Sequence, residues 1–173
     1  PYFNYSGYLM NLFKKYPKSI LEFKTKSVFI ENLLNQEPTP NTLISWSMNT
    51  PHIIAQEEKN TPSLEERFLA ANKLVKKGYK VGFHFDPIYY YPNWQEDYGQ
   101  VLEKLCQKFS PQNIGWISLG VIRFHPDLKE ILYNRGSLIM DMELFPAFND
   151  GKMRLFYDLR QEVMQFFLKN LSP

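Results

Sequence analysis

Short apolar runs alternate with longer amphipathic stretches along most of the chain. In the longer stretches apolar residues recur every three or four positions, which is the spacing of a helix that buries one face. Strands that alternate with helical crossovers of roughly 10 to 15 residues form parallel sheets, so the pattern predicts an α/β fold. The expected strands are residues 19–23, 42–48, 80–85 and 115–122, with 137–142 as a candidate fifth, and the expected helices are 5–16, a short one ending at 34, 64–77, 94–109, 126–133 and 155–171.

The segment 64–77 carries the clearest helix signals. Ser63 and Glu66 have the spacing of a capping box, in which each side chain bonds the backbone N–H of the other residue. Gly78 suits the left-handed position at which many helices end. The buried stripe of this helix is expected at Leu64, Phe68, Ala71 and Val75.

Prolines and local composition set other boundaries. Asp86-Pro87 is expected to stop the strand that starts at Lys80, and Asn49-Thr50-Pro51 predicts a turn. Residues 115–122 are nearly all apolar, which predicts a strand covered on both faces. Pro17 is expected to end the first helix, whose apolar face would be Leu9, Leu12, Phe13 and Tyr16.

The composition is that of a globular domain. The 173 residues are 44% hydrophobic, which excludes a disordered tail and favours one domain over residues 1–173. The net charge of +2 argues against a protein that holds nucleic acid by bulk charge, although a local basic groove stays open. No apolar run approaches the roughly 20 residues of a membrane helix.

The single cysteine, Cys106, excludes an intramolecular disulfide and favours a reducing, cytoplasmic setting. It lies on or near the apolar face of the helix expected at 94–109, which predicts a buried structural thiol.

Polar residues follow several of the predicted strands. In parallel α/β folds, ligands bind at the carboxyl ends of the strands, where loops lead into helices. These positions therefore form a candidate binding rim, which consists of Lys24, Thr25, Lys26, Ser47, Asn49, His84, Asp86, Arg123, His125 and Glu143.

Several rim residues also have a purely structural interpretation. Lys26 could pair with Glu31, and Asp86 could cap a turn before the following proline. His84, between two phenylalanines, could be a hydrogen-bonded core histidine.

The same choice exists at Arg123 and at the tyrosines 89–91. Arg123 could pair with Asp127 or Glu143. The tyrosines could stack on bases, or they could pack as an aromatic loop.

Known catalytic and metal-binding motifs are absent from the sequence. It has no Cys-x-x-Cys, no His-Glu-x-x-His and only three histidines. It also lacks Gly-x-Gly-x-x-Gly, a phosphate loop and Gly-x-Ser-x-Gly. Composition and spacing alone therefore predict an α/β domain with a polar rim, and they assign no reaction.

Six blocks follow one another along the chain: Phe23-Lys24-Thr25-Lys26-Ser27, Ile44-Ser45-Trp46-Ser47-Met48-Asn49, Thr61-Pro62-Ser63-Leu64-Glu65-Glu66-Arg67, Gly78-Tyr79-Lys80-Val81-Gly82-Phe83-His84-Phe85-Asp86-Pro87-Ile88, Trp116-Ile117-Ser118-Leu119-Gly120 and Asp150-Gly151-Lys152-Met153-Arg154. In this order they resemble the later part of the spore photoproduct lyase family, a radical S-adenosylmethionine family. The resemblance runs from about residue 19 to the final helix.

The resemblance implies a partial parallel (β/α) barrel, with this chain holding the later strands of a TIM-like barrel. The family holds a [4Fe–4S] cluster on a C-x₃-C-x₂-C loop. The cluster cleaves S-adenosylmethionine to a deoxyadenosyl radical, which takes hydrogen from a thymine dimer and so splits the cross-link in DNA.

The family motifs also imply site residues. Lys26, Ser47 and Asn49 match the S-adenosylmethionine contacts; a lysine suits the carboxylate of the cofactor, and hydroxyl and amide groups suit its ribose and amino acid parts. His84, Asp86 and Arg123, from the same rim, are the candidate substrate contacts.

The sequence departs from the family at the cluster loop. One cysteine cannot replace three thiolates, and Cys106 lies in the wrong element, so no metal ligand is assigned in this chain. Since the chain also begins at Pro1, directly before a helical segment, we expect the C-terminal part of a larger DNA-repair enzyme that is inactive on its own. Two alternatives stay open: a cluster-less α/β domain that binds nucleic acid or a protein, and a barrel hydrolase that uses Asp86 or Glu143.

Overall fold

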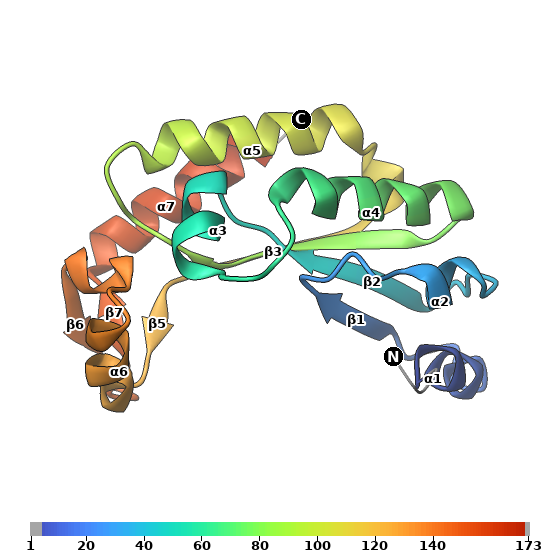
Figure 1. Cartoon of the computed structure of the whole chain (residues 1–173), viewed down its shortest axis with the longest axis horizontal. Helices are drawn as coiled ribbons and strands as arrows, with labels where there is room; N and C mark the ends of the chain where they lie inside the picture. The colour runs from blue at the N-terminus through green and yellow to red at the C-terminus, as the bar shows by residue number, and fades with distance from the viewer. Residues whose placement is uncertain (1–4, 172–173) are drawn as a thin grey trace. The chain divides into compact units, whose positions relative to one another are not determined.

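The computed structural model describes residues 5–171 (Figure 1). Its helices are α1 (Tyr5–Phe13), α2 (Glu31–Leu34), α3 (Pro51–Glu57), α4 (Leu64–Lys77), α5 (Trp94–Lys108), α6 (Lys129–Asn134) and α7 (Tyr157–Leu171). Its strands are β1 (Leu21–Thr25), β2 (Thr42–Ser47), β3 (Lys80–Ile88), β4 (Ile114–Val121), β5 (Arg123–Phe124), β6 (Leu144–Pro146) and β7 (Met153–Leu155). Short 3₁₀ helices lie at Pro111–Asn113, Pro126–Leu128 and Leu138–Asp141.

The first four strands form one sheet in the order β1-β2-β3-β4. β1 runs parallel to β2, with Leu21 opposite Thr42, and β2 runs parallel to β3, with Leu43 opposite Lys80. Helices fill the connections between these strands, as parallel neighbours require. The predicted parallel α/β architecture is therefore confirmed.

The chain divides into two compact units. The first holds the residues up to 48 together with 61–84 and 105–118, and the second holds 49–60, 85–104 and the residues from 119 onward. Strand β3, helix α5 and strand β4 each pass from one unit into the other.

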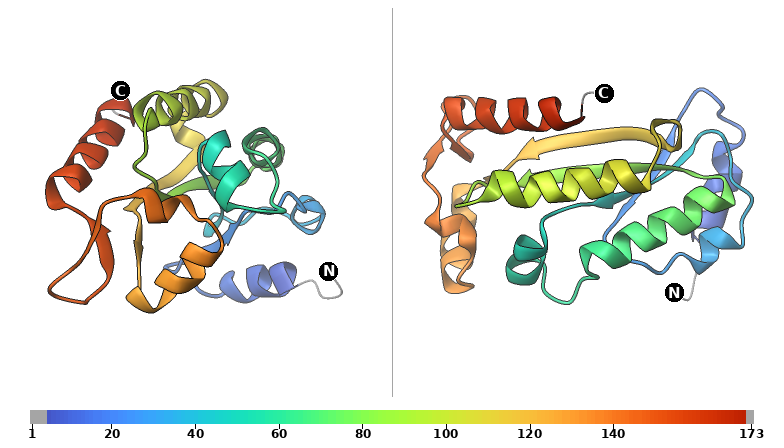
Figure 2. Two further views of the ribbon diagram at one scale, coloured as in Figure 1. Left: turned by 60° about the vertical axis from the view of Figure 1, so that its left-hand side comes forward. Right: turned by 90° about the horizontal axis from the view of Figure 1, so that it is seen from above.

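The sheet of the first unit has two chemically different faces, because successive side chains of a strand point to opposite sides. On one face Trp46, Val81 and Phe83 are completely buried. Helix α4 runs beside β2 (Figures 1 and 2), and its Phe68 ring lies 6.3 Å from Phe83 and 5.9 Å from Phe109. The opposite face carries the polar side chains described below.

The second unit has its own apolar core. Rings of Phe85, Tyr98 and Phe167 pack with centroids 5.1 to 6.4 Å apart. The short strands β5, β7 and β6 form an antiparallel sheet in that order, and Figure 2 shows the β6–β7 hairpin leading into α7. A further buried cluster consists of Ile53, Tyr89, Ile122, Ile139 and Leu155.

Helix α4 has the predicted bounds and ends. The Ser63 hydroxyl accepts a hydrogen bond from the Glu66 N–H, and the Glu66 carboxylate accepts one from the Ser63 N–H. Gly78 closes the helix with φ of 106°. The predicted stripe is correct except that Leu74, not Val75, is buried.

The predicted fifth strand is wrong, because residues 138–141 form a 3₁₀ helix instead. The Ser137 hydroxyl accepts a hydrogen bond from the Ile139 N–H, and this local cap favours a helical turn over strand pairing. Strands β6 and β7, which follow, were not predicted. Each has three residues, too few to display a period.

The predicted end of the third strand is also wrong, since β3 continues through Asp86-Pro87 to Ile88. Pairing with β2 ends where His84 lies opposite Ser47, so the missing N–H of Pro87 removes no bond from that ladder. His84 and Asp86 therefore lie inside a strand rather than after one.

Three burial predictions fail as well. β4 is half-buried along most of its length rather than covered on both faces. Cys106 is exposed, because it lies about 100° around α5 from the buried Leu105. Helix α1 ends at Phe13 and buries Met10, while Leu12 is exposed.

Helix α3 begins at the residues that were predicted to form only a turn. The Thr50 hydroxyl accepts a hydrogen bond from the Ile53 N–H, and Pro51 occupies the first turn. Both are favourable at a helix start. Within residues 5–171, no helix combines the length and apolar character needed to span a bilayer.

The capping box predicts a measurable stability effect. Ser63→Ala removes the acceptor of the Glu66 N–H, and we expect it to lower the free energy of unfolding by about 1 kcal/mol in urea titrations. Ser110 precedes a 3₁₀ helix without a side-chain cap bond, so Ser110→Ala should change it by less than about 0.5 kcal/mol. Equal losses in the two variants would contradict this account.

Candidate functional site

The polar face of the first unit brings together one side chain from each of the four parallel strands. These are Glu22 of β1, Ser45 of β2, His84 of β3 and Trp116 of β4. Glu22 Oε1 accepts hydrogen bonds from Ser45 Oγ at 2.6 Å and from Trp116 Nε1 at 3.1 Å, and His84 Nε2 lies 2.6 Å from the same oxygen. We call these four residues the Glu22 cluster.

The Glu22 cluster is partly shielded from water. The side chain of His84 is 11% exposed and that of Glu22 is 27% exposed. Burial raises the pKa of the Glu22 carboxyl, but the hydrogen bonds from Ser45 and His84, the charge of His84 and the Trp116 bond outweigh it and lower the pKa below its usual 4.5. The carboxylate is therefore ionised at neutral pH.

Gly82 makes room for this arrangement. It lies opposite Ser45 in the β2–β3 ladder. A Cβ atom at Gly82 would stand 3.1 Å from the Ser45 Cβ and 3.3 Å from Trp116 Nε1. The absence of a side chain here lets the Trp116 indole reach Glu22.

Lys26 and Ser47 also belong to the first unit, at the carboxyl ends of β1 and β2. The residues on both sides of Lys26 are anchored, because the Ser27 N–H donates to Thr25 Oγ1 at 2.9 Å and Trp46 Nε1 donates to the Ser27 carbonyl at 3.0 Å. Lys26 is half-buried, and it leaves a turn that these two hydrogen bonds anchor.

Arg67 holds the end of β2 in place. This completely buried side chain donates from Nη1 to the Ser47 carbonyl at 2.8 Å, from Nε to the Pro62 carbonyl at 3.0 Å and from Nη2 to Thr61 Oγ1 at 2.8 Å. It ties the strand end to the start of α4.

Asn49, in the second unit, is buried in a hydrogen-bond network. Its Oδ1 accepts from the Tyr98 hydroxyl at 2.5 Å, and its Nδ2 donates to the Pro87 carbonyl at 3.2 Å. Burial raises the pKa of Tyr98 well above 10, which keeps the hydroxyl a donor. The Asn49 amide thus has a structural role, and its predicted cofactor contact stays a prediction.

Asp86 and Arg123 come together in the second unit. Asp86 Oδ1 lies 3.8 Å from Arg123 Nη1, and both side chains are partly exposed. Arg123 lies within β5, and this contact links it to Asp86 rather than to the two carboxylates considered from sequence. A Cβ atom at Gly120 would lie 2.5 Å from Asp86 Oδ1 and would clash with it, so the missing side chain of the glycine leaves room for the carboxylate.

The six predicted site residues are therefore divided between the units. Lys26, Ser47 and His84 belong to the first, and Asn49, Asp86 and Arg123 to the second. A common rim for all six stays a prediction. Sequence reasoning missed Glu22, Ser45 and Trp116, although a glutamate inside an apolar strand was a usable signal.

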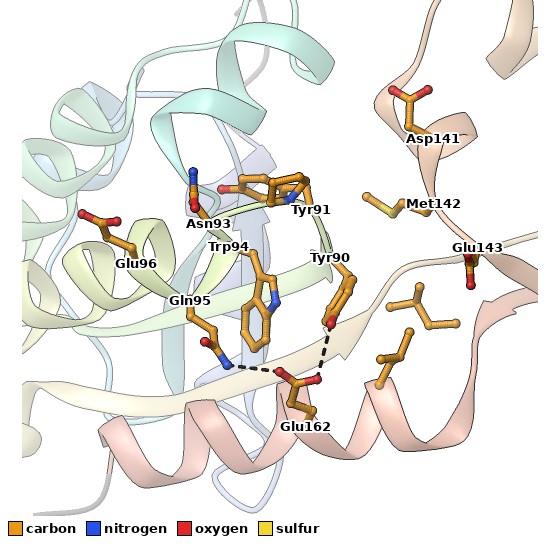
Figure 3. A pocket seen from close by; sticks show the side chains of 13 residues that line it. Tyr90, Tyr91, Asn93, Trp94, Gln95, Glu96, Asp141, Met142, Glu143 and Glu162 are labelled. Carbon is orange, nitrogen blue, oxygen red and sulfur yellow. Dashed lines mark hydrogen bonds between the residues drawn. The ribbon is translucent and has the colours of Figure 1, made fainter.

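The second unit also contains a cavity of about 760 Å³ (Figure 3). Tyr90 and Trp94 form part of its wall, and Glu162 accepts hydrogen bonds there from the Tyr90 hydroxyl at 3.4 Å and from Gln95 Nε2 at 3.1 Å. Glu96, Asp141 and Glu143 add further carboxyl groups, whereas none of the described lining residues is Lys or Arg. Such a cavity disfavours phosphate groups.

No group of three or more His, Cys, Asp or Glu side chains within residues 5–171 is arranged to hold a metal ion. The lone Cys106 stands exposed on α5.

Comparisons with known proteins agree with the sequence blocks. The family model for spore photoproduct lyase matches residues 7–143. The spore photoproduct lyase of Clostridium acetobutylicum is 32% identical over 182 aligned positions, which cover 99% of this chain and 54% of that protein. The Bacillus subtilis spore photoproduct lyase is 36% identical over 85 positions, covering 49% of this chain and 25% of that protein.

Solved structures agree with the fold. A spore photoproduct lyase variant with bound AdoMet and dinucleoside spore photoproduct superposes with a TM-score of 0.75 at 23% identity, over 88% of this chain and 47% of that one. This likeness supports the partial parallel (β/α) barrel. The chain spans about half the length of the Clostridium acetobutylicum protein and of the superposed structure. Because the family model covers most of the chain and a relative matches nearly all of it, this chain belongs to the spore photoproduct lyase family.

Proposed function

We propose that the protein that carries this chain is a radical S-adenosylmethionine lyase that repairs a thymine photoproduct in DNA. The observation that supports this most strongly is the 32% identity to a spore photoproduct lyase over 99% of the chain. A solved relative holds AdoMet and a dinucleoside spore photoproduct, which are the cofactor and substrate class we propose here.

Within this proposal, the first unit contributes to the cofactor site. Lys26 binds the cofactor carboxylate through a charge-assisted hydrogen bond, and Ser47 contacts its ribose or amino acid part. The support is positional, since both residues lie at carboxyl ends of parallel strands and both are held by anchored backbone. Asn49 is included by motif match, and its carbonyl oxygen, which already accepts from the Tyr98 hydroxyl, would accept a second hydrogen bond from the cofactor. When bound, S-adenosylmethionine supplies an organic radical that takes hydrogen from the substrate.

The residues of this chain do not fit an iron–sulfur cluster. Such clusters need several thiolates, and the sequence has one cysteine. We therefore propose that the cluster ligands lie outside residues 1–173.

For the substrate, we propose contacts from His84, Asp86 and Arg123. Arg123 is 45% exposed and can reach a phosphate or base edge, while Asp86 limits its freedom. DNA is the proposed partner. The lack of thiolates also favours a second candidate, a cluster-less domain that binds nucleic acid or a protein.

Iron analysis tests the assignment of the cluster. After anaerobic reconstitution, residues 1–173 should hold no stoichiometric iron or sulfide, because one cysteine cannot supply the ligands. The Clostridium acetobutylicum relative, treated in parallel, serves as the positive control. A near-stoichiometric cluster on a monomer of this chain would contradict the prediction, whereas a cluster-free intact protein would favour the second candidate.

Lys26→Ala tests the proposed cofactor contact. Loss of a charge-assisted hydrogen bond worth about 1.5–3 kcal/mol should weaken S-adenosylmethionine binding by about 10- to 150-fold in the intact protein. Anaerobic calorimetry measures the affinity. Iron content should not change, because no cluster ligand is altered.

Lys24→Ala is the matched control for Lys26→Ala. Lys24 is exposed within β1, two positions before Lys26, and its removal should matter less. Equal cofactor affinity in wild type and Lys26→Ala would refute the assignment. Unfolding of Lys26→Ala would instead indicate a structural ion pair.

A further inference from the structure

The Glu22 cluster determines which nitrogen of His84 carries the proton. An ionised carboxylate can only accept hydrogen bonds, and Glu22 Oε1 lies 2.6 Å from His84 Nε2. Nε2 is therefore the donor. The Trp116 indole, which can only donate, is closer to Glu22 Oε1 at 3.1 Å than to His84 Nε2 at 3.5 Å, and this agrees with the same assignment.

In the neutral imidazole, a proton on Nε2 leaves the other ring nitrogen, Nδ1, as a hydrogen-bond acceptor. The imidazolium form, whose charge favours the ionised Glu22, carries protons on both nitrogens and has no acceptor, so the inference concerns the neutral ring. Within residues 5–171, Nδ1 of His84 has no hydrogen-bond partner. The two other donors to Glu22, Ser45 and Trp116, hold the carboxylate that orients the ring. A carboxylate that fixes one histidine nitrogen so that the other is presented in a single state is a recurrent arrangement in binding and catalytic sites.

His84 also lies at a place where a ligand can meet it. It stands opposite Ser47, the last residue of β2, and Glu22 and Lys24 share one face of β1. Helix α4 packs its Phe68 on the opposite, apolar side of the sheet, against Phe83. The partial exposure of Glu22 and His84 lets solvent reach the polar face.

We propose that Glu22 is a positioning residue, and that His84 Nδ1 accepts a hydrogen bond from an N–H group of the ligand bound at this face. The inference rests on the proposed function and deepens it. Two ligands of that reaction offer such a donor: the amine groups of S-adenosylmethionine and the imide N–H of the thymine-derived base. The chemistry required of His84 is the same for both.

The tautomer is measured directly. In the intact protein, ¹⁵N spectra of the His84 imidazole should show the proton on Nε2 near neutral pH. Glu22→Gln removes the charge and can offer an N–H to Nε2, so it should convert this single state into a mixture. A wild-type ring that carries its proton on Nδ1 alone, or protons on both nitrogens, would overturn the proposal.

His84→Gln separates ligand binding from structural support. The glutamine amide can still donate to Glu22 from the position of Nε2, but it has no acceptor at the position of Nδ1. We expect a folded protein whose affinity falls about 5- to 100-fold for one of two probes, S-adenosylmethionine or the dinucleoside spore photoproduct, measured separately by calorimetry. The probe that loses affinity identifies the donor.

His52→Gln is the matched control, the same substitution at an exposed histidine of α3. It should leave both affinities within about twofold, since His52 has no part in the Glu22 cluster. If wild type binds both probes and His84→Gln binds them equally well, the inference fails and the proposed function stands. If wild type binds neither probe, the proposed function fails and the inference fails with it.

Discussion

The first unit depends on one carboxylate oxygen, Glu22 Oε1, that joins side chains from all four parallel strands. Ser45, His84 and Trp116 each bring a polar hydrogen toward the same point between the strands. Without an acceptor there, these donors would be desolvated without compensation, which costs more than a hydrogen bond contributes. The charge of Glu22 converts an unfavourable cluster into a favourable one, and the lowered pKa of its carboxyl expresses that gain.

The same oxygen matters for the edge of the sheet. β1 is one of the two edge strands in the order β1-β2-β3-β4, and it has five residues. A short edge strand forms backbone hydrogen bonds with one neighbouring strand only, so it gains less from pairing than a central strand, which has two neighbours. Glu22 adds side-chain bonds that reach past β2 to β3 and β4. The strand that leads to Lys26 is thereby joined to the middle of the sheet.

Sequence reasoning succeeded where structure is encoded locally. Helix α4 was predicted to the residue because Ser63, Glu66 and Gly78 fix its two ends within a few positions. It failed where pairing between strands distant in the sequence determines whether a strand forms and where it ends. The continuation of β3 past Pro87 depends on where its pairing with β2 stops. The short strands β6 and β7 are stabilised by pairing with each other and, for β7, with β5. The spacing of apolar residues within a segment does not reveal which distant strand it pairs with.

At the candidate site, too, local sequence predicted some residues and distant contacts decided the role of others. This limits how far a role can be transferred from a family motif to a residue of this chain. Strand ends were enough to select Lys26 and Ser47, but Glu22 gains its role from Trp116, 94 positions away in the sequence. At Asn49 the motif predicted a cofactor contact, yet the amide also joins Tyr98 to the Pro87 carbonyl. Replacing Asn49 would therefore disturb the packing of the second unit as well as any ligand. A loss of cofactor binding at Asn49 is weaker support for direct contact than the same loss at Lys26, whose side chain leaves a turn anchored by its neighbours.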